Sequence, residues 1–522
     1  MSCRFVFTAL ALYTAAALWS AWPAVRHLDG EHFLARPAAG AGGAAAGDHL
    51  QLGWTFWLVG HQLEHGHSPI SDPYSFRPYG TAHPQLQGWL YGIPFWPLHH
   101  LFGQVWAYNL LVLLSIVLAG ALTAWWLRTI DVGRAAALVG GLAFALAPYR
   151  LGQSTGHLLG LVTFLLPALL LALERRRLVV AGVALCAIPL SGQPHLALGA
   201  IPLAAGYGVA RLPRDLWPRV AAACLAAIAA GALVAVAVVS GSIGEARTFH
   251  QVAHYSATFG DFLDRSPDDG IERFVFAGYL LPALALGGLA TARASRGLRV
   301  FLALAAIVPT ALALGSHLPG YHFLWRAVPG LHSTRVPERL FPIACLALAA
   351  LAALALDRAR HHFVLLQHKL VFAAGLAAVV VVVTADLRAP LFGAVAADTP
   401  NRAYAAIRGD GALLELPIFR PDIHFGSVYL AYARQSPRER PQGYSTVAPP
   451  IALRFARAKR GLSCGYDVGI PPAVQWIAIH RNLYAQSGWF AANCPERAEQ
   501  MLERLGWTRV ERDGPITIYG RS

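Results

Sequence analysis

Charged residues are scarce in this chain. They make up 13% of its 522 residues, whereas apolar residues make up 56%. Soluble proteins carry about twice that share of charge. So few charged groups cannot cover a water-exposed surface of this size. The shortage excludes an ordinary cytosolic enzyme, and the high apolar content excludes a disordered protein.

Lysine is almost absent, although the net charge is +14. A strongly basic chain can indicate nucleic-acid binding. Here only Lys369 and Lys459 are lysines, and many of the forty arginines lie between apolar runs. This distribution is typical of membrane proteins, in which basic residues mark the cytoplasmic loops. We therefore expect membrane lipids, and no nucleic acid, among the partners.

Nucleotide-binding motifs and acidic residues within the apolar runs are missing as well. The sequence has no Walker A loop, no G-x-G-x-x-G after a strand and no D-x-D. The largest predicted cytoplasmic loop, 358–368, is too short for a nucleotide-binding domain, which argues against a nucleotide-activated donor in the cytoplasm. Acids occur in the apolar runs only as their last residues, Glu174, Asp357 and Asp386, which argues against an ion-coupled transporter.

Apolar runs close to membrane-spanning length recur along the chain. We predict eleven transmembrane helices, at 5–25, 105–127, 134–149, 157–174, 178–193, 195–210, 219–243, 274–292, 299–315, 340–357 and 369–386. Arginines occupy every second short loop, which predicts a cytoplasmic N-terminus and an extracytoplasmic C-terminus. The expected fold class is mainly α. A polytopic domain of the cytoplasmic membrane covers 1–386, and a small extracytoplasmic α/β domain covers 387–522.

The first extracytoplasmic loop, 26–104, contains the most distinctive local pattern. It opens with a flexible linker, Pro37–Gly47, followed by a predicted helix from Asp48 to about His65. Apolar residues and tryptophans recur on one face of this helix, so we expect it to lie at the membrane interface, with its polar residues pointing elsewhere. A second interfacial or re-entrant piece is expected at 86–102, broken by Pro94 and Pro97.

The C-terminal region has the patterns of strands and of one amphipathic helix. Strand candidates are Leu413–Phe419, Val474–His480, Thr508–Glu511 and Ile516–Tyr519. A helix is expected at Pro495–Leu505, with inward side chains at Ala498, Met501, Leu502 and Leu505. Cys464 and Cys494 both fall in this region, where a disulfide would persist if the two residues meet. The sequence alone leaves that pairing open.

Polar residues gather at the predicted outer helix ends, where they are expected to converge on one face. The candidates for chemistry are Asp48, Arg150, His157, Arg335 and Arg339. Acids and arginines at a water–lipid boundary suit an amphiphile with a charged head group, because arginine binds phosphate through paired hydrogen bonds.

Each candidate also has a purely structural alternative. Asp48 could simply cap its helix, and Arg150 could be an interfacial anchor. His157 could be a packing histidine. Arg335 and Arg339 could pair with Glu338 or with lipid head groups.

One motif points elsewhere. His61-Gln62-Leu63-Glu64-His65 spells H-x-x-E-H, the inverted zinc-protease motif. The chain contains 21 histidines, so a chance match is unsurprising. No convincing third acidic ligand follows on an extracytoplasmic helix. We therefore predict no metal-binding residues here, although a divalent metal remains possible and no other cofactor is indicated.

Several segments together carry a resemblance to a known family. GDHLQLGWTFW (47–57) and HQLEHGHSP (61–69) resemble the first-loop motif of bacterial polytopic glycosyltransferases of the GT-C superfamily. In that motif an acid opens an interfacial helix, and tryptophans and H-x-L-x-x-G-x-x-P follow. Further similar segments are AYNL (107–110), PYR…GH (148–157), STRVPER (333–339), LLELP (413–417) and QGYS (442–445).

The resemblance implies inverting transfer of a sugar from a polyprenyl-phosphate donor to an acceptor on the outer face of the membrane. Asp48 matches the first-loop acid of the family, which would be the general base. Arg150, His157, Arg335 and Arg339 would then hold the lipid phosphate. Many members have two adjacent acids in this loop, whereas His49 follows Asp48 here, and that departure puts the use of a metal in doubt.

Two other functions share these sequence features. A flippase for lipid-linked sugars, or a non-catalytic protein of envelope assembly, would have the same apolar runs, basic loops and C-terminal domain. Neither function requires Asp48, and neither would transfer sugar. The sequence identifies neither the sugar nor the acceptor, which could be a glycan, a lipid or a protein.

The arginine pattern makes a testable prediction about topology. A cysteine introduced near Gly443 should react with a membrane-impermeant thiol reagent in intact cells, because the C-terminal domain is expected outside. Labelling that requires permeabilised cells would contradict the eleven-helix topology.

Overall fold

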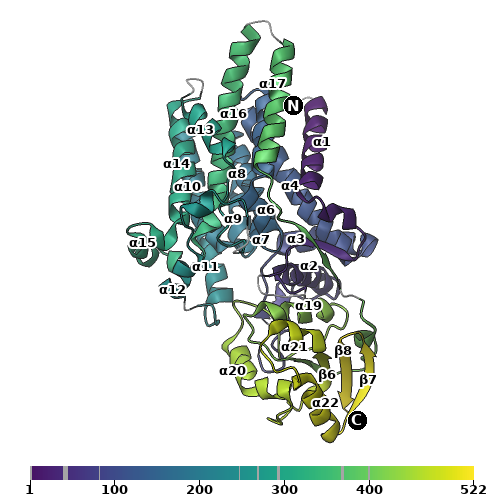
Figure 1. The fold of residues 1–522 in the computed structure, drawn as a ribbon. Coiled ribbons are helices and arrows are strands. Elements are labelled where there is room, and N and C mark those ends of the chain that lie inside the picture. The colour runs from purple at the N-terminus through teal and green to yellow at the C-terminus, as the bar shows by residue number, and fades with distance from the viewer. Residues whose placement is uncertain are drawn as a thin grey trace. The chain divides into compact units, whose positions relative to one another are not determined.

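The computed structural model describes residues 3–38, 45–80, 83–245, 247–266, 270–290, 294–365, 369–397 and 400–521. The chain forms two compact units (Figure 1). The helical unit comprises Met1–Arg26, Leu110–Val234 and Arg247–Gly393. The loop–tail unit comprises His27–Asn109, Ala235–Ala246 and Ala394–Ser522, and so unites most of the first loop with the C-terminal region. Most of the predicted linker Pro37–Gly47 lies outside the described residues.

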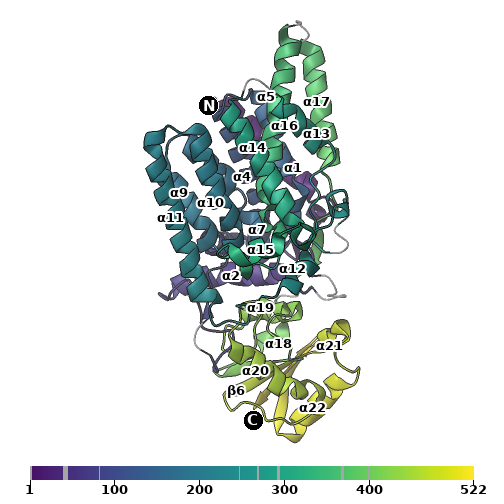
Figure 2. The same ribbon diagram turned by 90° about the vertical axis from the view of Figure 1, so that its left-hand side faces the viewer.

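Each apolar run predicted to span the membrane coincides with one helix or with consecutive helices. The helices of this part are α1 (Cys3–Ser20), α4 (Gln104–Thr129), α5 (Arg134–Ala145), α6 (Pro148–Ser154), α7 (Leu158–Val162), α8 (Leu165–Glu174), α9 (Leu178–Leu190), α10 (Pro194–Arg211), α11 (Trp217–Val234), α12 (Phe249–Tyr255), α13 (Leu280–Leu289), α14 (Arg296–Ala313), α15 (Tyr321–Ala327), α16 (Phe341–Leu365) and α17 (Lys369–Asp386). Figure 2 shows α9 and α11 side by side, and α16 packs against both α13 and α14.

Within the described residues, five helices are long and apolar enough to cross a membrane, and the pair α5–α6 would be a sixth span. This pair bends by 48°. The bend falls just before Pro148, which begins α6, because the residue that precedes a proline is disfavoured in a helix. The protein is therefore a polytopic helical membrane protein, as its composition predicts. The number of eleven spans stays a prediction.

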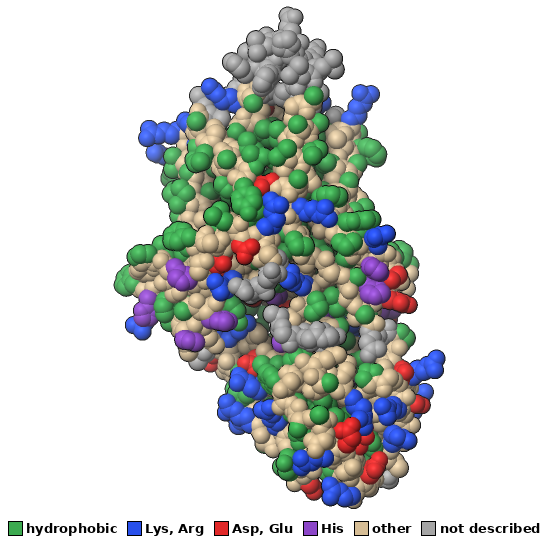
Figure 3. Space-filling model, in the orientation of Figure 1, with side chains coloured by type: hydrophobic (Ala, Val, Ile, Leu, Met, Phe, Trp, Pro, Cys, Tyr) green, Lys and Arg blue, Asp and Glu red, His purple; other side chains and the backbone are tan. Residues whose placement is uncertain are grey.

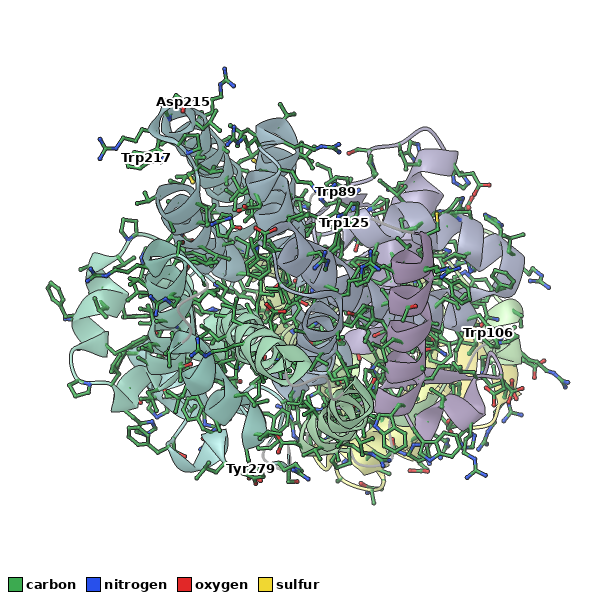
Figure 4. All side chains as sticks on the ribbon, turned by 90° about the horizontal axis from the view of Figure 1, so that it is seen from above. Trp89, Trp106, Trp125, Asp215, Trp217 and Tyr279 are labelled. Atoms are coloured by element: carbon green, nitrogen blue, oxygen red, sulfur yellow. A yellow bond between two sulfur atoms is a disulfide. The ribbon has the colours of Figure 1, made fainter. Side chains whose placement is uncertain are left out.

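The surface of the helical unit fits contact with lipid. Figure 3 shows hydrophobic side chains over much of its visible face. Strongly exposed examples are Val179, Leu225, Leu286 and Ile307. Arg214 lies over the ring of Trp217 at 5.8 Å. Figure 4 places Trp217, with Asp215, at the outer edge of this unit, in keeping with the preference of tryptophan for the membrane interface.

The loop–tail unit contains the expected first-loop helix, α2 (Asp48–Glu64), and a second helix, α3 (Trp89–Phe102). The prediction that the polar residues of α2 lie apart from its packed surface is wrong. Its three glutamine and threonine side chains, Gln51, Thr55 and Gln62, are buried. Each donates a hydrogen bond to a backbone carbonyl, which offsets part of the cost of burial.

The expected break in α3 is also wrong, because the helix continues through Pro94 and Pro97. Close packing against α2 accounts for this. A Cβ atom added at Gly92 would lie only 2.5 Å from Cβ of Val59. The absence of a side chain at Gly92 therefore allows the two helices to approach closely, and their packing offsets the hydrogen bonds that the prolines cannot donate.

The C-terminal region is built on a four-stranded sheet with the order β5-β6-β8-β7 (Figure 1). Its strands are β5 (Ala412–Leu416), β6 (Val474–His480), β7 (Trp507–Asp513) and β8 (Ile516–Arg521). β5 and β6 are parallel, and the other pairs are antiparallel. All four predicted strands are confirmed. The surrounding helices are α18 (Arg402–Ala405), α19 (Ser427–Ala433), α20 (Pro450–Lys459), α21 (Arg481–Ser487) and α22 (Cys494–Arg504).

One sheet face and α22 share a hydrophobic core. Ala498, Met501 and Leu502 are buried in it, as predicted. Leu505 is 45% exposed, so its predicted inward position is wrong. The helix ends before this residue, since Gly506 takes a positive φ of 82° and turns the chain away. Cys464 and Cys494 form a disulfide beside this core, which settles the pairing that the sequence left open.

Two short pairs of strands complete the unit. β1 (His32–Ala35) pairs with β4 (Gly393–Ala396), and β2 (Ser71–Asp72) pairs with β3 (His83–Pro84). β1 follows the first predicted span and β4 follows the last. Their pairing therefore joins the beginning of the first loop to the beginning of the C-terminal region.

A buried carboxylate stabilises the sheet. Glu415 on β5 accepts a hydrogen bond of 2.6 Å from the Tyr404 hydroxyl and lies 3.0 Å from Nε2 of His480 and 3.1 Å from Nε of Arg440. Burial works against ionisation, but these three partners outweigh it and hold the pKa of Glu415 below its ordinary value. The carboxylate is therefore charged and satisfied.

Replacing Glu415 should destabilise the C-terminal region strongly. Glu415→Ala leaves the buried Arg440 without its carboxylate, which costs about 3–5 kcal/mol. Glu439→Ala is the matched control, because Glu439 pairs with Arg77 at 3.2 Å but is 41% exposed; such pairs contribute less than about 1 kcal/mol. Thermal unfolding of the purified full chain, followed by tryptophan fluorescence, compares the two. Equal losses would contradict the role assigned to the buried network.

Gly443 is buried, so the topology test is better made at Glu503, which is exposed on α22. A cysteine introduced there replaces a side chain that is exposed to solvent in this structure.

Candidate functional site

Asp48 begins α2 in the loop–tail unit and contacts the C-terminal region. The N-cap is Gly47, which has no side chain to satisfy the first turn, so Asp48 is not the capping residue. The hydroxyl of Tyr444 donates a 2.5 Å hydrogen bond to Oδ1 of Asp48. The side-chain amide of Gln51, one turn along α2, donates to the backbone carbonyl of Tyr444 at 3.1 Å. These two bonds fix the Asp48 carboxylate against the segment QGYS.

The charge of this carboxylate acts on two histidines, His49 and His424. His49 is fully buried, and neither ring nitrogen has a hydrogen-bond partner among the described residues. Burial lowers the pKa of His49 to about 4, although the charge of Asp48 acts in the opposite direction. His424 is half-buried, and burial lowers its pKa despite Asp48. Asp48 therefore sits beside neutral imidazoles that can donate or accept hydrogen bonds.

A second polar cluster lies in the helical unit, around Glu272. The carboxylate of Glu272 forms an ion pair with Arg339 at 3.0 Å and lies 3.9 Å from Nε2 of His157. Gln153 holds this histidine in place, with 2.7 Å between Oε1 of Gln153 and Nδ1 of His157. Burial disfavours the charge on Glu272, but Arg339, His157 and Arg335 together hold its pKa below the ordinary value.

Three of the four residues expected to hold phosphate thus gather around one carboxylate. Arg335 acts on Glu272 electrostatically and lies over the ring of Tyr255 at 5.2 Å. Arg150 lies in the same unit but has different hydrogen-bond partners. It is fully buried and donates to the Thr163 hydroxyl at 2.8 Å, to the Ala145 carbonyl at 3.0 Å and to the Ser115 carbonyl at 2.8 Å.

The alternative pairing of Arg339 with Glu338 is not what the structure shows. Arg339 pairs with Glu272, while Glu338 is buried and its carboxylate has no hydrogen-bond partner in the described part of the chain. Glu272 was not among the residues predicted for the site. Its position in a long loop gives no signal in the sequence, because its partners come from distant segments.

Tyr444 was also not predicted as a site residue, although its segment carried the family resemblance. No segment of the family resemblance included His424. A tyrosine hydroxyl or a histidine in a small α/β domain has many ordinary roles. The partner of Tyr444 lies 396 residues earlier in the chain, beyond the reach of local sequence patterns.

Two groups of three side chains could hold a metal ion among the residues that the structure describes. They are His27, Asp29 and His32, and His61, Glu64 and His65 of the H-x-x-E-H motif. In the second group, Nε2 of His61 is 2.9 Å from the Tyr74 hydroxyl and Nδ1 of His65 is 2.8 Å from a backbone carbonyl, so these atoms already have partners. Neither group includes Asp48. The described side chains therefore do not build a three-ligand metal site at Asp48.

No protein-family model matches the sequence, and no curated protein matches it. Solved structures are similar to it. The arabinofuranosyltransferase AftD from mycobacteria aligns with 100% of this chain at 17% identity, with a TM-score of 0.59. The oligosaccharyltransferase of Archaeoglobus fulgidus aligns with 96% of it at 12% identity, with a TM-score of 0.50. The chain has the same fold as these two proteins, in agreement with the resemblance described above.

These likenesses establish the fold. The chain spans 40% of the length of the mycobacterial protein and 73% of the length of the archaeal one. At such low identity, residue roles and substrates do not follow from the superposition. The expected fold class, a polytopic GT-C-like membrane protein, is confirmed.

The neutral state of His49 predicts an acid-sensitive structure. The unfolded chain binds a proton at His49 near pH 6.5, whereas the folded chain does so only near pH 4. Between these values the unfolded state holds more protons, so stability falls as the pH falls, by up to about 1.4 kcal/mol per pH unit.

This contribution can be measured as the shift of melting temperature between pH 7 and pH 4.5. His49→Gln should reduce the shift, whereas His67→Gln, at an exposed histidine of the same loop, serves as the matched control. An unchanged shift in His49→Gln would show that His49 does not titrate in this way.

Proposed function

We propose that this protein is a membrane glycosyltransferase that moves a sugar from a polyprenyl-phosphate donor to an acceptor on the outer face of the cytoplasmic membrane, with inversion. One observation carries the proposal. On a GT-C fold, Asp48 begins the first-loop helix with its carboxylate held by Tyr444. Both solved relatives that support the fold are described as glycosyl-transferring enzymes.

Asp48 acts as the general base. Its carboxylate takes the proton of the acceptor hydroxyl while that oxygen bonds to the anomeric carbon. The bond between this carbon and the phosphate oxygen breaks, and the leaving polyprenyl phosphate keeps the electron pair. A positioned base contributes roughly 10²- to 10⁴-fold to the rate. The hydrogen bond from Tyr444 orients the carboxylate for this transfer.

Arg339, Arg335 and His157 bind the donor phosphate. They lie around Glu272, whose carboxylate holds Arg339 at 3.0 Å and balances part of their positive charge. The charge that develops on the leaving phosphate is stabilised by such preorganised donors. For Arg150, whose guanidinium donates to Ser115, Ala145 and Thr163, we propose a role in the same donor-binding region. No step of this mechanism requires a metal ion.

Asp48→Asn tests the base directly. The amide cannot accept a proton at neutral pH, and since Gly47 is the N-cap, the substitution leaves the helix cap unchanged. We expect the variant to fold and bind donor, with transfer slowed about 10²-fold or more. The assay uses purified protein in nanodiscs with a panel of polyprenyl-phosphate sugars and a mixture of acceptors.

Tyr444→Phe accompanies it as a graded control. This variant keeps the carboxylate and loses only the hydrogen bond that orients it, so we expect a smaller loss of rate than in Asp48→Asn. Full activity of Asp48→Asn would end the assignment of the base. A flippase or a non-catalytic assembly protein would transfer no sugar in any variant.

Arg339→Lys and Arg150→Lys test the donor side. Lysine keeps the charge but loses the planar fork, so we expect both variants to use donor less well, with KM for the donor raised about tenfold or more. Arg150→Lys should also melt at a lower temperature, because lysine cannot reproduce all the buried hydrogen bonds of the guanidinium.

Arg326→Lys, at an exposed residue of α15, is the control. If both variants turn over donor as well as wild type, the two arginines serve packing rather than phosphate binding. A lower melting temperature for Arg150→Lys with unchanged KM would assign that residue to packing alone.

A further inference from the structure

Arg434 follows α19 in the loop–tail unit and is a buried cation without a counterion. Its side chain is 9% exposed. Neither terminal nitrogen, Nη1 or Nη2, has a hydrogen-bond partner among the described residues. Within the described part of the chain, the guanidinium donates one hydrogen bond, from Nε to the Ala431 carbonyl at 3.4 Å. No described carboxylate forms an ion pair with it.

An unpaired buried charge is costly, so this arrangement needs an explanation. Burial alone lowers the pKa of Arg434, to about 10, and no acidic neighbour opposes the shift. At neutral pH the group is still charged. Folded proteins rarely leave a buried guanidinium with unused donors, because the lost hydration is not replaced. The two unused nitrogens form a fork that fits the two oxygens of a phosphate or a carboxylate.

Other buried nitrogens without partners lie on α2, against which α19 packs, and on α3, which also packs on α2. The charge of Arg434 acts on His49 and on His99 of α3. Both ring nitrogens of His49 and Nδ1 of His99 are buried without hydrogen-bond partners. A neutral imidazole carries one N–H donor, which it can direct to an oxyanion. Cationic and neutral donors from three helical segments are thus gathered within one region.

Gly53 allows the guanidinium to lie against α2. A Cβ atom added at Gly53 would be 2.7 Å from Nη1 of Arg434. His49 and Gly53 are four residues apart on the same helix, so they share one face. The fork of Arg434 therefore lies over the face of α2 that carries His49, one residue after Asp48.

We propose that Arg434, His49 and His99 form a binding site for one oxyanionic group, a phosphate or a carboxylate, carried by a substrate to the residues around Asp48. The site is distinct from the cluster around Glu272, with which it shares no residue. The claim that a substrate carries the bound group rests on the proposed function. The claim that the site binds an oxyanion is independent of that function.

Phosphate binding by the purified full chain tests the site. The melting temperature is measured in nanodiscs with increasing inorganic phosphate, against chloride at equal ionic strength, at pH 7. A ligand that binds only the folded state raises the melting temperature with its concentration. We expect phosphate to stabilise the wild type, and Arg434→Gln to weaken its apparent affinity about ten- to hundredfold.

Arg434→Gln also gives a second readout without phosphate. It removes an unpaired buried charge, so the variant should melt at a higher temperature than wild type in chloride. A structural arginine would show the opposite. Arg420→Gln is the matched control in the same region, because Arg420 is exposed and paired with Asp422 at 2.9 Å. It should leave the phosphate response unchanged.

Gly53→Ala tests the geometry with the charge retained. The new methyl group displaces the end of a flexible side chain, and alanine favours the helix, so the variant should fold. We expect weaker phosphate binding. Equal phosphate responses in wild type, Arg434→Gln and Gly53→Ala would overturn the proposal, as would a lower melting temperature of Arg434→Gln in chloride.

Two further measurements separate this proposal from the proposed function and identify the source of the anion. Asp48→Asn should bind phosphate as wild type does, so a failure of sugar transfer does not affect the site. Undecaprenyl phosphate added to the nanodiscs should abolish the response to inorganic phosphate if the natural ligand is a lipid head group. An undiminished response assigns the site to an anionic group of the acceptor.

Discussion

A single hydrogen bond, from the hydroxyl of Tyr444 to the carboxylate of Asp48, joins parts of the chain that lie 396 residues apart. It is reinforced by Gln51, which donates to the backbone of the same tyrosine. Together with the backbone hydrogen bonds of Phe76 and Arg77 to the C-terminal region and the pairing of β1 with β4, these contacts join the first loop and the C-terminal region into one unit. The orientation of the candidate base and the surroundings of Arg434 and His49 both depend on that union.

The loop–tail unit buries its polar groups in two different ways. In the C-terminal region Glu415 has three partners and is fully satisfied. Around Asp48 and Arg434, by contrast, several buried nitrogens have no partner among the described residues. Satisfied networks stabilise a fold, and unsatisfied ones cost stability. The unused donors around Arg434 are therefore the ones to which we assign a ligand.

Much of the fold could be predicted from the sequence because its signals are local. The length of each apolar run placed the helices of the membrane part. The alternation within Val474–His480 placed β6, and the linker followed by Asp48 placed the start of α2. The errors arise where tertiary contacts override these local signals. The polar side chains of α2 found backbone partners, and close packing at Gly92 carried α3 through its prolines.

The candidate site could be predicted only in part, because its pairings are not local. Asp48, His157 and Arg339 stood out by type and position. Glu272, Tyr444 and Arg434 did not, since an acid in a loop, a tyrosine and an arginine in a small domain are common. What distinguishes them is a partner far along the chain, or the lack of one, and only the folded structure shows that.

The loop–tail unit is assembled from three separate stretches, the last of which begins at Ala394. A ribosome therefore completes Asp48 and its helix long before it makes Tyr444 or Arg434. During synthesis the first-loop helix has none of these partners, and the carboxylate is unoriented. Any chain that stops short of its final quarter lacks the tyrosine that orients the base. The first-loop residues therefore reach their functional arrangement only when nearly the whole polypeptide has been translated.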